Sequence, residues 1–493
     1  AALVLCAAGV KVFLYESLRP VPVLSFTIRH LKCIAGIVIT ASHNPKQYNG
    51  YKAYWEDGAQ LPPEHADVVS ATMQKLDIFE DVKLADFDEA LAAGKIVMLG
   101  ADMDEKYLAC VQAQAVNPEA VKAVADELKI VYSPLHGTGY RLVPEILRRL
   151  GHKNVFTVDE QMVISGDFPT VAKPNPEYKE VFDIGMKIAD EVGSDLVVAT
   201  DPDADRVGVV TRTPDGSFTT ITGNQMGALL MDYILTAYEE TNTMPEIPFA
   251  VKTIVTTELA AKICEAHGVK MHNVLTGFKF IGEKIQQFQD TGDHTFLFGF
   301  EESYGFLSST FVRDKDGVNA SLLIAEAAAW ARTQGKTLYD ILQEIFATYG
   351  YYVEGVVSIT LPGKDGVAKM QSIEKFAYNL ASGTYSDPAG IYYGEKYFGE
   401  EAKKDITEIV YQIIDTYKAR IKTNDILGDE SKEKAILKLS KMGVKMGYPE
   451  KPRAIDWVFD FVEMFVFVLI AVMVLTSFFF KHSVVEGESM LNT

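Results

Sequence analysis

The chain has 493 residues and 48% of them are apolar, so its length allows three or four domains with sizeable cores. The 67 acidic side chains outnumber the 47 basic ones and give a net charge of −20, which argues against nucleic acid as a partner. The four cysteines are scattered and form no CxxC pair, which argues against a disulfide framework or zinc cluster and favours the cytoplasm.

From residue 1 to about 355, strand-like and helical stretches alternate. The chain opens with an apolar helix, Gly9 and the strand-like run VKVFLYE. Because this reads as the middle of an α/β unit, we expect that an N-terminal portion is missing. Further apolar runs, IAGIVIT, LKIVYS, SDLVVAT, FAVKTIV and HTFLFGF, alternate with helical segments such as PEILRRL. The alternation predicts an α/β fold with mainly parallel sheets, in which sites gather at the C-terminal ends of strands.

The first candidate site is Ser42, in the segment TASHNP directly after the strand GIVI. A serine on a loop after a buried strand can act as a nucleophile if a base or a strong electrophile lies nearby. No GxSxG elbow is present, so a hydrolase triad is not indicated. Taken by itself, a serine in such a loop is more often a turn or cap residue.

The second candidate site is the segment DPDADR, which follows the strand DLVVAT and carries Asp201, Asp203 and Asp205. Three carboxylates at alternate positions repel one another unless a cation lies between them, and hard oxygen ligands suit Mg²⁺. An EF-hand loop is excluded because Arg206 and Arg212 stand where it needs Gly and Glu. The alternative is an acidic surface turn.

The third candidate site is GFEESYG (299–305), again after an apolar strand. Carboxylates and hydroxyls between glycines suit the hydroxyls of a sugar, and the nearby RDKDG (313–317) supplies cations for a phosphate. The alternatives are an ordinary turn and a solvated charged turn. Together, the three sites indicate phosphoryl transfer on a sugar.

TASHNP, DPDADR and GFEESYG, in this order and spacing, resemble the α-D-phosphohexomutase family over residues 1–373. The resemblance implies that Ser42 is a phosphoserine, and that Asp201, Asp203 and Asp205 bind Mg²⁺ with the phosphoserine oxygen as a further ligand. It implies catalytic roles for Lys52 and Arg206. It also implies substrate contacts from His43, Lys279, Glu301, Ser303 and Lys315.

The segments HGTGY (136–140), FPTVAKPNPE (168–177) and TGFKF (276–280) resemble the phosphoglucomutase-like branch of this family. The resemblance implies that a hexose monophosphate and glucose 1,6-bisphosphate, as intermediate and activator, are the ligands. It leaves glucose and mannose phosphates open, and it favours a structural role for His136.

After about residue 373 the resemblance ends. The family's phosphate loop RxSGTEP is not found; Ser382-Gly383-Thr384 is only a fragment of it, so activity is expected to be impaired. AGIYYGEKYFGEEAKKD and KAILKLSKMGVKMGYPEKP resemble neprilysin-type metallopeptidases, but HExxH is absent. Residues 464–480 predict a transmembrane helix that would anchor the chain, and a buried core helix is the alternative. The last residues resemble the start of type I signal peptidases, with Ser489 as nucleophile but without the catalytic Lys.

The chain therefore reads as a fusion of unrelated families. Its predicted parts are three α/β mutase domains (1–115, 116–235, 236–355), a remnant leading to a fourth (356–373), a helical peptidase-like segment (374–455) and a transmembrane, signal-peptidase-like end (456–493). A phosphohexomutase is the leading hypothesis. The alternatives are a membrane-anchored signal peptidase fragment and a non-catalytic sugar-phosphate-binding protein.

Overall fold

The computed structural model describes residues 1–48, 50–352 and 354, together with isolated helical positions between 404 and 440. The chain divides into two compact units, residues 1–353 and 354–493. In the second unit the described positions from 404 to 440 are all helical, as predicted for this charged stretch. The remaining description concerns the first unit.

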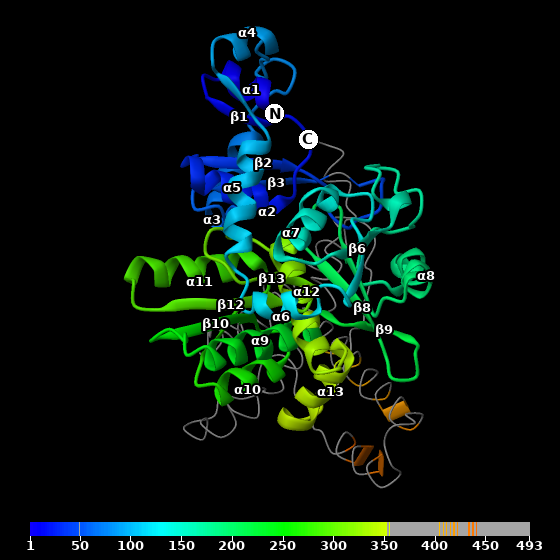
Figure 1. Cartoon of the computed structure of the whole chain (residues 1–493). Coiled ribbons are helices and arrows are strands. Elements are labelled where there is room, and N and C mark those ends of the chain that lie inside the picture. Colours follow the sequence, from blue (N-terminus) through cyan, green and yellow to red (C-terminus); the bar gives the residue numbers. More distant parts are fainter. Residues whose placement is uncertain are drawn as a thin grey trace, which may run out of the picture. The chain divides into compact units, whose positions relative to one another are not determined.

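The first region of this unit contains two small sheets. Strands β1 and β4 pair in parallel, and β2 and β3 pair antiparallel (Figure 1). The elements are α1 (Ala2–Ala7), β1 (Val12–Tyr15), α2 (Val21–Leu31), β2 (Ala35–Ile39), β3 (Tyr51–Trp55), α3 (Pro63–Met73), α4 (Phe87–Ala92), β4 (Ile96–Leu99) and α5 (Ala101–Gln112).

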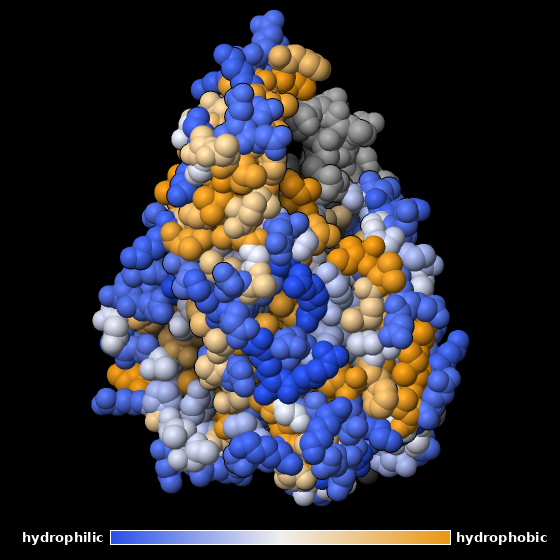
Figure 2. Space-filling view, turned by 45° about the horizontal axis from the view of Figure 1, so that its top comes forward, coloured by the Kyte–Doolittle hydropathy of each residue, from blue (hydrophilic) through white to orange (hydrophobic). Residues whose placement is uncertain are grey.

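This first region exposes more large apolar side chains than the two regions that follow it. Most large apolar side chains that are exposed among the described residues lie between residues 18 and 98, with Phe79 89% and Ile34 72% exposed. Figure 2 shows apolar colour over the upper part of the face it presents.

The second region is built on a five-stranded sheet in the order β6-β5-β7-β8-β9. The first three strands are parallel, and β8 and β9 continue the sheet antiparallel. The elements are α6 (Pro118–Val124), β5 (Lys129–Ser133), η1 (Thr138–Tyr140), α7 (Leu142–Leu150), β6 (Asn154–Thr157), η2 (Asp159–Gln161), η3 (Lys179–Phe182), α8 (Asp183–Val192), β7 (Leu196–Thr200), β8 (Val207–Arg212) and β9 (Phe218–Ile221).

The third region has a four-stranded sheet in the order β11-β10-β12-β13, parallel except for β13. The predicted boundary at residue 235 falls inside helix α9, which packs on β12 and so groups with this sheet. The elements are α9 (Gly223–Glu240), β10 (Pro248–Thr253), α10 (Glu258–Ala266), β11 (Lys270–Val274), α11 (Phe278–Thr291), β12 (Thr295–Glu301), β13 (Gly305–Leu307), α12 (Gly317–Thr333) and α13 (Leu338–Tyr349).

Helix α12 packs against elements of all three regions, and almost every one of its residues is buried. It packs on α6 and α7 of the second region and on α5 of the first. A helix that is apolar on all sides is stable only where neighbours cover it all round. The Asp316 carboxylate caps its start by accepting from the backbone N–H groups of Val318 and Asn319. This cap fixes the start of α12.

The predicted α/β architecture with mixed sheets is confirmed, and the apolar runs that were read as strands form β2, β5, β7, β10 and β12. Among the described residues, no helix is both long and apolar enough to cross a membrane. The predicted transmembrane segment at 464–480, the fragment at 382–384 and Ser489 lie outside the described residues, and they stay predictions.

Candidate active site

Ser42 lies in the loop that joins the antiparallel strands β2 and β3. Its backbone is in the left-handed region, with φ +51°. Such a conformation costs about 1–2 kcal/mol for a non-glycine residue, so local bonds must hold it. The backbone N–H of Ser42 donates to the Thr40 hydroxyl (2.8 Å), which in turn donates to Asp203 (3.3 Å). The turn therefore lifts the Ser42 hydroxyl away from the strand.

The three aspartates lie in the loop between β7 and β8. Asp201 turns back on its own loop, because its Oδ1 accepts from the backbone N–H groups of Asp205 (3.1 Å) and Arg206 (3.0 Å). Asp201, Asp203 and Asp205 are all buried, and one oxygen of each lies within 4.8 Å of the others. One oxygen of each of the three carboxylates is therefore close enough to the other two to share a single metal ion.

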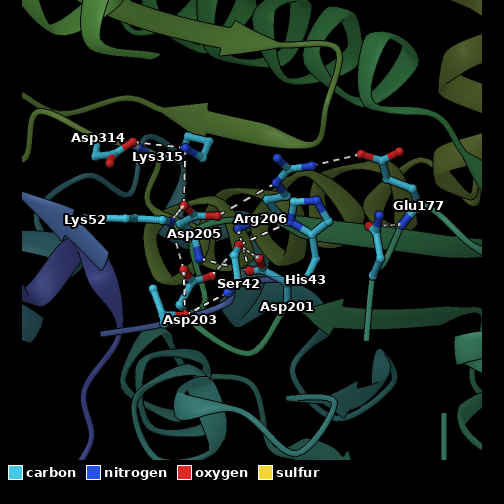
Figure 3. Close-up of polar contacts among 12 residues, drawn as sticks. Ser42, His43, Lys52, Glu177, Asp201, Asp203, Asp205, Arg206, Asp314 and Lys315 are labelled. Atoms are coloured by element: carbon cyan, nitrogen blue, oxygen red, sulfur yellow. Dashed lines mark hydrogen bonds and ion pairs between the residues drawn. The ribbon is translucent and has the colours of Figure 1, made fainter. Parts of the chain in front are cut away.

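The fold brings Ser42 onto this loop from 159 residues away in sequence. The Ser42 Oγ lies 2.9 Å from Asp201 Oδ2 and 3.0 Å from Asp203 Oδ1 (Figure 3). Two of the residue sets that were predicted separately are thus one site. A hydroxyl that contacts two carboxylates is placed to share a cation with them.

Two lysines neutralise the carboxylates from opposite parts of the sequence. Lys52, on β3, has its Nζ 2.9 Å from Asp203 Oδ2 and 3.2 Å from Asp205 Oδ2. Lys315, after β13, has its Nζ 3.2 Å from the same Asp205 oxygen. Burial lowers the pKa of both ammonium groups, but the aspartates outweigh it and the pKa of each lies above its ordinary value. Both lysines are therefore charged.

The aspartate cluster has a buried oxygen without a hydrogen bond, which a metal ion could coordinate. Asp205 Oδ1 is buried and accepts no hydrogen bond. Burial, followed by repulsion from Asp203 and Asp205, raises the pKa of Asp201 well above its ordinary value. Buried carboxylates with an oxygen that accepts no hydrogen bond from the described residues fit a hard divalent cation such as Mg²⁺, which prefers oxygen ligands. Asp201, Asp203, Asp205 and the Ser42 hydroxyl are the groups that would hold it.

Arg206 directs its guanidinium across the site and is fixed by Glu177. The Arg206 guanidinium lies 2.9 Å from Glu177 Oε1, and its Nε lies 3.9 Å from Asp205 Oδ1. Both side chains of the Arg206–Glu177 pair are largely buried. The Arg206 guanidinium is therefore held in one orientation beside the β7–β8 loop that carries the three aspartates.

His43 stands next to the serine hydroxyl, with Nδ1 3.2 Å from Ser42 Oγ. Burial, together with the nearby Arg206 and lysines, holds the pKa of His43 well below its ordinary value. The imidazole is therefore neutral at physiological pH, and one of its nitrogens is available as an acceptor.

The predicted sugar-binding loop turns between β12 and β13. Glu301 Oε1 accepts from the backbone N–H of Gly277 (2.9 Å), while Glu302 faces the hydroxyls of Thr253 and Thr256 (3.4 Å each). Burial raises the pKa of Glu301 to about 7, against the opposing effect of Lys315. The two adjacent glutamates thus differ: Glu302 braces the strand ends, and Glu301 keeps an oxygen for other contacts.

The remaining predicted residues are less closely tied to the carboxylates. Ser303 is buried in the β12–β13 turn. Lys279, the second residue of α11, has its Nζ 5.2 Å from the ring centroid of Phe280, and its role as a substrate contact stays a prediction. Both ring nitrogens of His136 are occupied, by the Val163 carbonyl and the Thr170 hydroxyl (2.8 Å each), which agrees with a structural role.

Three residues of the site had no role in the sequence analysis: Glu177, Tyr54 and Asp314. Asp314 Oδ1 lies 3.1 Å from Lys315 Nζ, and its Oδ2 accepts from the Tyr54 hydroxyl (2.6 Å). Glu177 and Asp314 lie inside segments that the sequence analysis singled out. Their roles could not be predicted from the sequence, because the residues they contact are brought to them only by the fold.

Models of known protein families match four stretches of the chain. Three are described as phosphoglucomutase/phosphomannomutase, alpha/beta/alpha domains I, II and III, and match residues 1–78, 105–216 and 222–349. The fourth, described as peptidase family M13, matches residues 355–449. This last match covers most of the stretch that resembles neprilysin-type metallopeptidases.

Curated relatives match the same part of the chain. A phosphoglucomutase of Staphylococcus saprophyticus is 37% identical over 370 residues, which cover 75% of this chain and 66% of that protein. One of Staphylococcus haemolyticus is 36% identical over 382 residues, covering 76% and 67%. The chain thus spans about two thirds of the length of the curated relatives it matches.

Solved structures show the same fold. A putative phosphomannomutase of Thermus thermophilus superposes with a TM-score of 0.55 at 27% identity, covering 71% of this chain and 74% of that one. A Paramecium phosphoglucomutase, pp63/parafusin, in an open form, superposes with a TM-score of 0.54 at 18% identity, covering 80% and 70%.

Proposed function

The chain belongs to the phosphoglucomutase/phosphomannomutase family, and from this premise we propose that it is a phosphohexomutase, with glucose 1-phosphate and glucose 6-phosphate as its substrate pair. One observation carries the proposal: the Ser42 hydroxyl contacts two carboxylates of a buried aspartate cluster that two lysines flank. This is the arrangement that phosphoryl transfer needs, because positioned positive charge stabilises the moving phosphoryl group.

In the proposed reaction Ser42 carries a phosphoryl group. The bond between phosphorus and Ser42 Oγ breaks while a bond forms to the free hydroxyl oxygen of a hexose monophosphate. The hydroxyl proton leaves the sugar, and the serine oxygen regains a proton. The glucose 1,6-bisphosphate so formed reorients, and its other phosphoryl group returns to Ser42. Glucose 1,6-bisphosphate therefore serves as intermediate and as activator.

Each neighbour of Ser42 has a distinct task in this proposal. Mg²⁺ bound to Asp201, Asp203 and Asp205 would supply charge neutralisation at the phosphoryl oxygens. Lys52 and Lys315 add two fixed positive charges, each 3.2 Å from Asp205 Oδ2. Neutral His43 lies within hydrogen-bond reach of Ser42 Oγ and can hold a proton there.

The substrate class follows from the β12–β13 turn. Glu301 keeps one carboxylate oxygen that the Gly277 N–H does not occupy, and Ser303 adds a hydroxyl; both suit the hydroxyls of a hexose. The relatives carry the name phosphoglucomutase and one solved structure the name putative phosphomannomutase, so mannose phosphates are the second substrates to assay.

The test is a coupled assay on the purified chain with Mg²⁺ and a trace of glucose 1,6-bisphosphate. We expect conversion of glucose 1-phosphate to glucose 6-phosphate and phosphorylation of Ser42 detectable by intact mass. Ser42→Ala should lose both, while Ser70→Ala, at an exposed serine of α3, should lose neither. Full turnover by Ser42→Ala would refute the mechanism. Ligand binding without phosphorylation would instead indicate a non-catalytic sugar-phosphate-binding protein.

A further inference from the structure

The segment between β13 and α12 holds an unusual concentration of buried charge. Arg313, Asp314, Lys315 and Asp316 follow one another, and none is more than 7% exposed. A solvated charged turn, the alternative that the sequence left open, is therefore wrong for this segment. Charged groups that are buried in succession must each have specific partners.

Asp314 is fully engaged on both carboxylate oxygens. Its Oδ2 accepts from the Tyr54 hydroxyl (2.6 Å) and from the Gln60 side-chain amide (2.9 Å). Its Oδ1 accepts from the backbone N–H of Lys315 (2.8 Å) and contacts Lys315 Nζ (3.1 Å). One carboxylate thus joins the β3 region to the segment that carries Lys315, over 260 residues of sequence.

The strand on the other side of this link carries Lys52. Side chains two residues apart on a strand point to the same face, so Lys52 and Tyr54 face the same way. The Tyr54 hydroxyl donates to Asp314. Lys52 contacts Asp205 (Figure 3). The Tyr54–Asp314 bond therefore fixes the distance between the strand that holds one lysine and the segment that holds the other.

The aliphatic part of the Lys315 side chain has little conformational freedom. A side-chain carbon on Gly305 would lie 2.1 Å from the Lys315 Cδ, so the stem runs directly over this glycine. Its ammonium then reaches Asp205 Oδ2 at 3.2 Å, the same distance and the same oxygen as the Lys52 ammonium. The same ammonium contacts Asp314 Oδ1 at 3.1 Å and lies 5.5 Å from the ring centroid of Phe278, so Asp314 and Asp205 together hold its charge in place.

We propose that Asp314, held by Tyr54 and Gln60, is a positioning residue that sets the Lys315 ammonium at Asp205, the carboxylate that Lys52 also contacts. Asp314 acts through Lys315 and does not itself touch the reacting groups. The catalytic consequence rests on the proposed function, whereas the placement of the ammonium does not. The two are therefore tested by separate measurements.

The first measurement is the rate at which an amine-specific reagent modifies Lys315, followed by peptide mass spectrometry on the full chain. Asp314→Asn keeps an oxygen for Tyr54 but loses the charge that holds Lys315. Since charge-assisted hydrogen bonds are the strong ones, we expect Lys315 to react about tenfold faster in this variant. Tyr54→Phe, which keeps all charges, should shift the rate in the same direction by less.

The matched controls are the neighbouring pair Asp316 and Tyr107. The Tyr107 hydroxyl donates to Asp316 Oδ1 at 2.7 Å, in the same way as Tyr54 to Asp314, but neither residue contacts a lysine of the cluster. Asp316→Asn and Tyr107→Phe should leave the modification rate of Lys315 unchanged. If Asp314→Asn fails to fold, Tyr54→Phe against Tyr107→Phe decides the question.

The second measurement is a double-mutant cycle on kcat. If Asp314 acts through Lys315, Asp314→Asn lowers kcat roughly ten- to a hundredfold in the wild-type background. It then has little further effect in a Lys315→Met background. Unchanged Lys315 reactivity in Asp314→Asn, or additive effects on kcat, would overturn the proposal. An inactive wild-type chain whose Lys315 reactivity responds as expected would contradict the proposed function and leave Asp314 as the positioning residue.

Discussion

Replacing Lys52 by methionine should destabilise the metal-free protein and at the same time strengthen its affinity for Mg²⁺. Methionine keeps the length of the side chain and removes the ammonium that lies 2.9 Å from Asp203 and 3.2 Å from Asp205. Three buried carboxylates would then be left with Lys315 and Arg206 as their cations. A divalent cation could take the place that the ammonium gave up.

The magnitude follows from the geometry. At about 3 Å and an effective dielectric constant of about 20, each contact is worth about 5 kcal/mol of attraction before desolvation. Removing one partner of a buried pair typically costs about 3–5 kcal/mol of folding stability, because the other charge stays buried. If Mg²⁺ recovers a third of this loss, the affinity rises roughly tenfold, since 1.4 kcal/mol is a factor of ten.

Titration calorimetry with MgCl₂ and thermal unfolding with and without Mg²⁺ measure both quantities. We expect a lower melting temperature for Lys52→Met in EDTA and a smaller difference from wild type at saturating Mg²⁺. Lys46→Met is the matched control, because Lys46 lies in the loop just before β3 but forms an exposed pair with Asp167 that should contribute little. An unchanged or weaker Mg²⁺ affinity in Lys52→Met would refute the view that the lysine and the metal compete for the negative charge of the same carboxylates.

Two further predictions concern the β12 strand and its turn. Because burial raises the pKa of Glu301 to about 7, the folded state holds an extra proton between about pH 4.5 and 7 and loses stability as the pH rises through this window. Glu301→Gln should therefore have a free energy of unfolding higher than that of wild type above pH 7, by on the order of 3 kcal/mol, and equal to it near pH 4. Urea titrations at both pH values measure this, and a difference in free energy of unfolding that is the same at both would contradict it. Gly227→Ala would place a carbon 2.0 Å from the Phe300 ring, so overpacking should cost about 1–3 kcal/mol, whereas Gly166→Ala meets nothing within 4 Å and should melt as wild type does. Equal melting temperatures for the two glycine variants would show that the ring moves aside freely.

Much of the fold could be predicted because the central strands are continuous apolar runs. Strands β5, β7, β10 and β12 lie in the middle of sheets, and their sequences LKIVYS, SDLVVAT, FAVKTIV and HTFLFGF indicate burial on both faces. The antiparallel strands that follow the motif loops were not named in advance. β13 has three residues, and so short a strand has too few residues for a periodic signal.

The sequence by itself determined which residue types could carry the proposed chemistry and that they stand at strand ends. Ser42, the aspartates of DPDADR and the glutamate of GFEESYG were identified in this way, and the structure brings Ser42 and the aspartates into contact. The tertiary structure decided which partners fix them: Glu177 on Arg206, and Asp314 with Tyr54 on Lys315. The physical reason is that these partners are distant in sequence and become specific only when burial removes water as a competing hydrogen-bond partner. The local sequence therefore shows what chemistry a side chain can perform, and tertiary packing determines which groups it contacts.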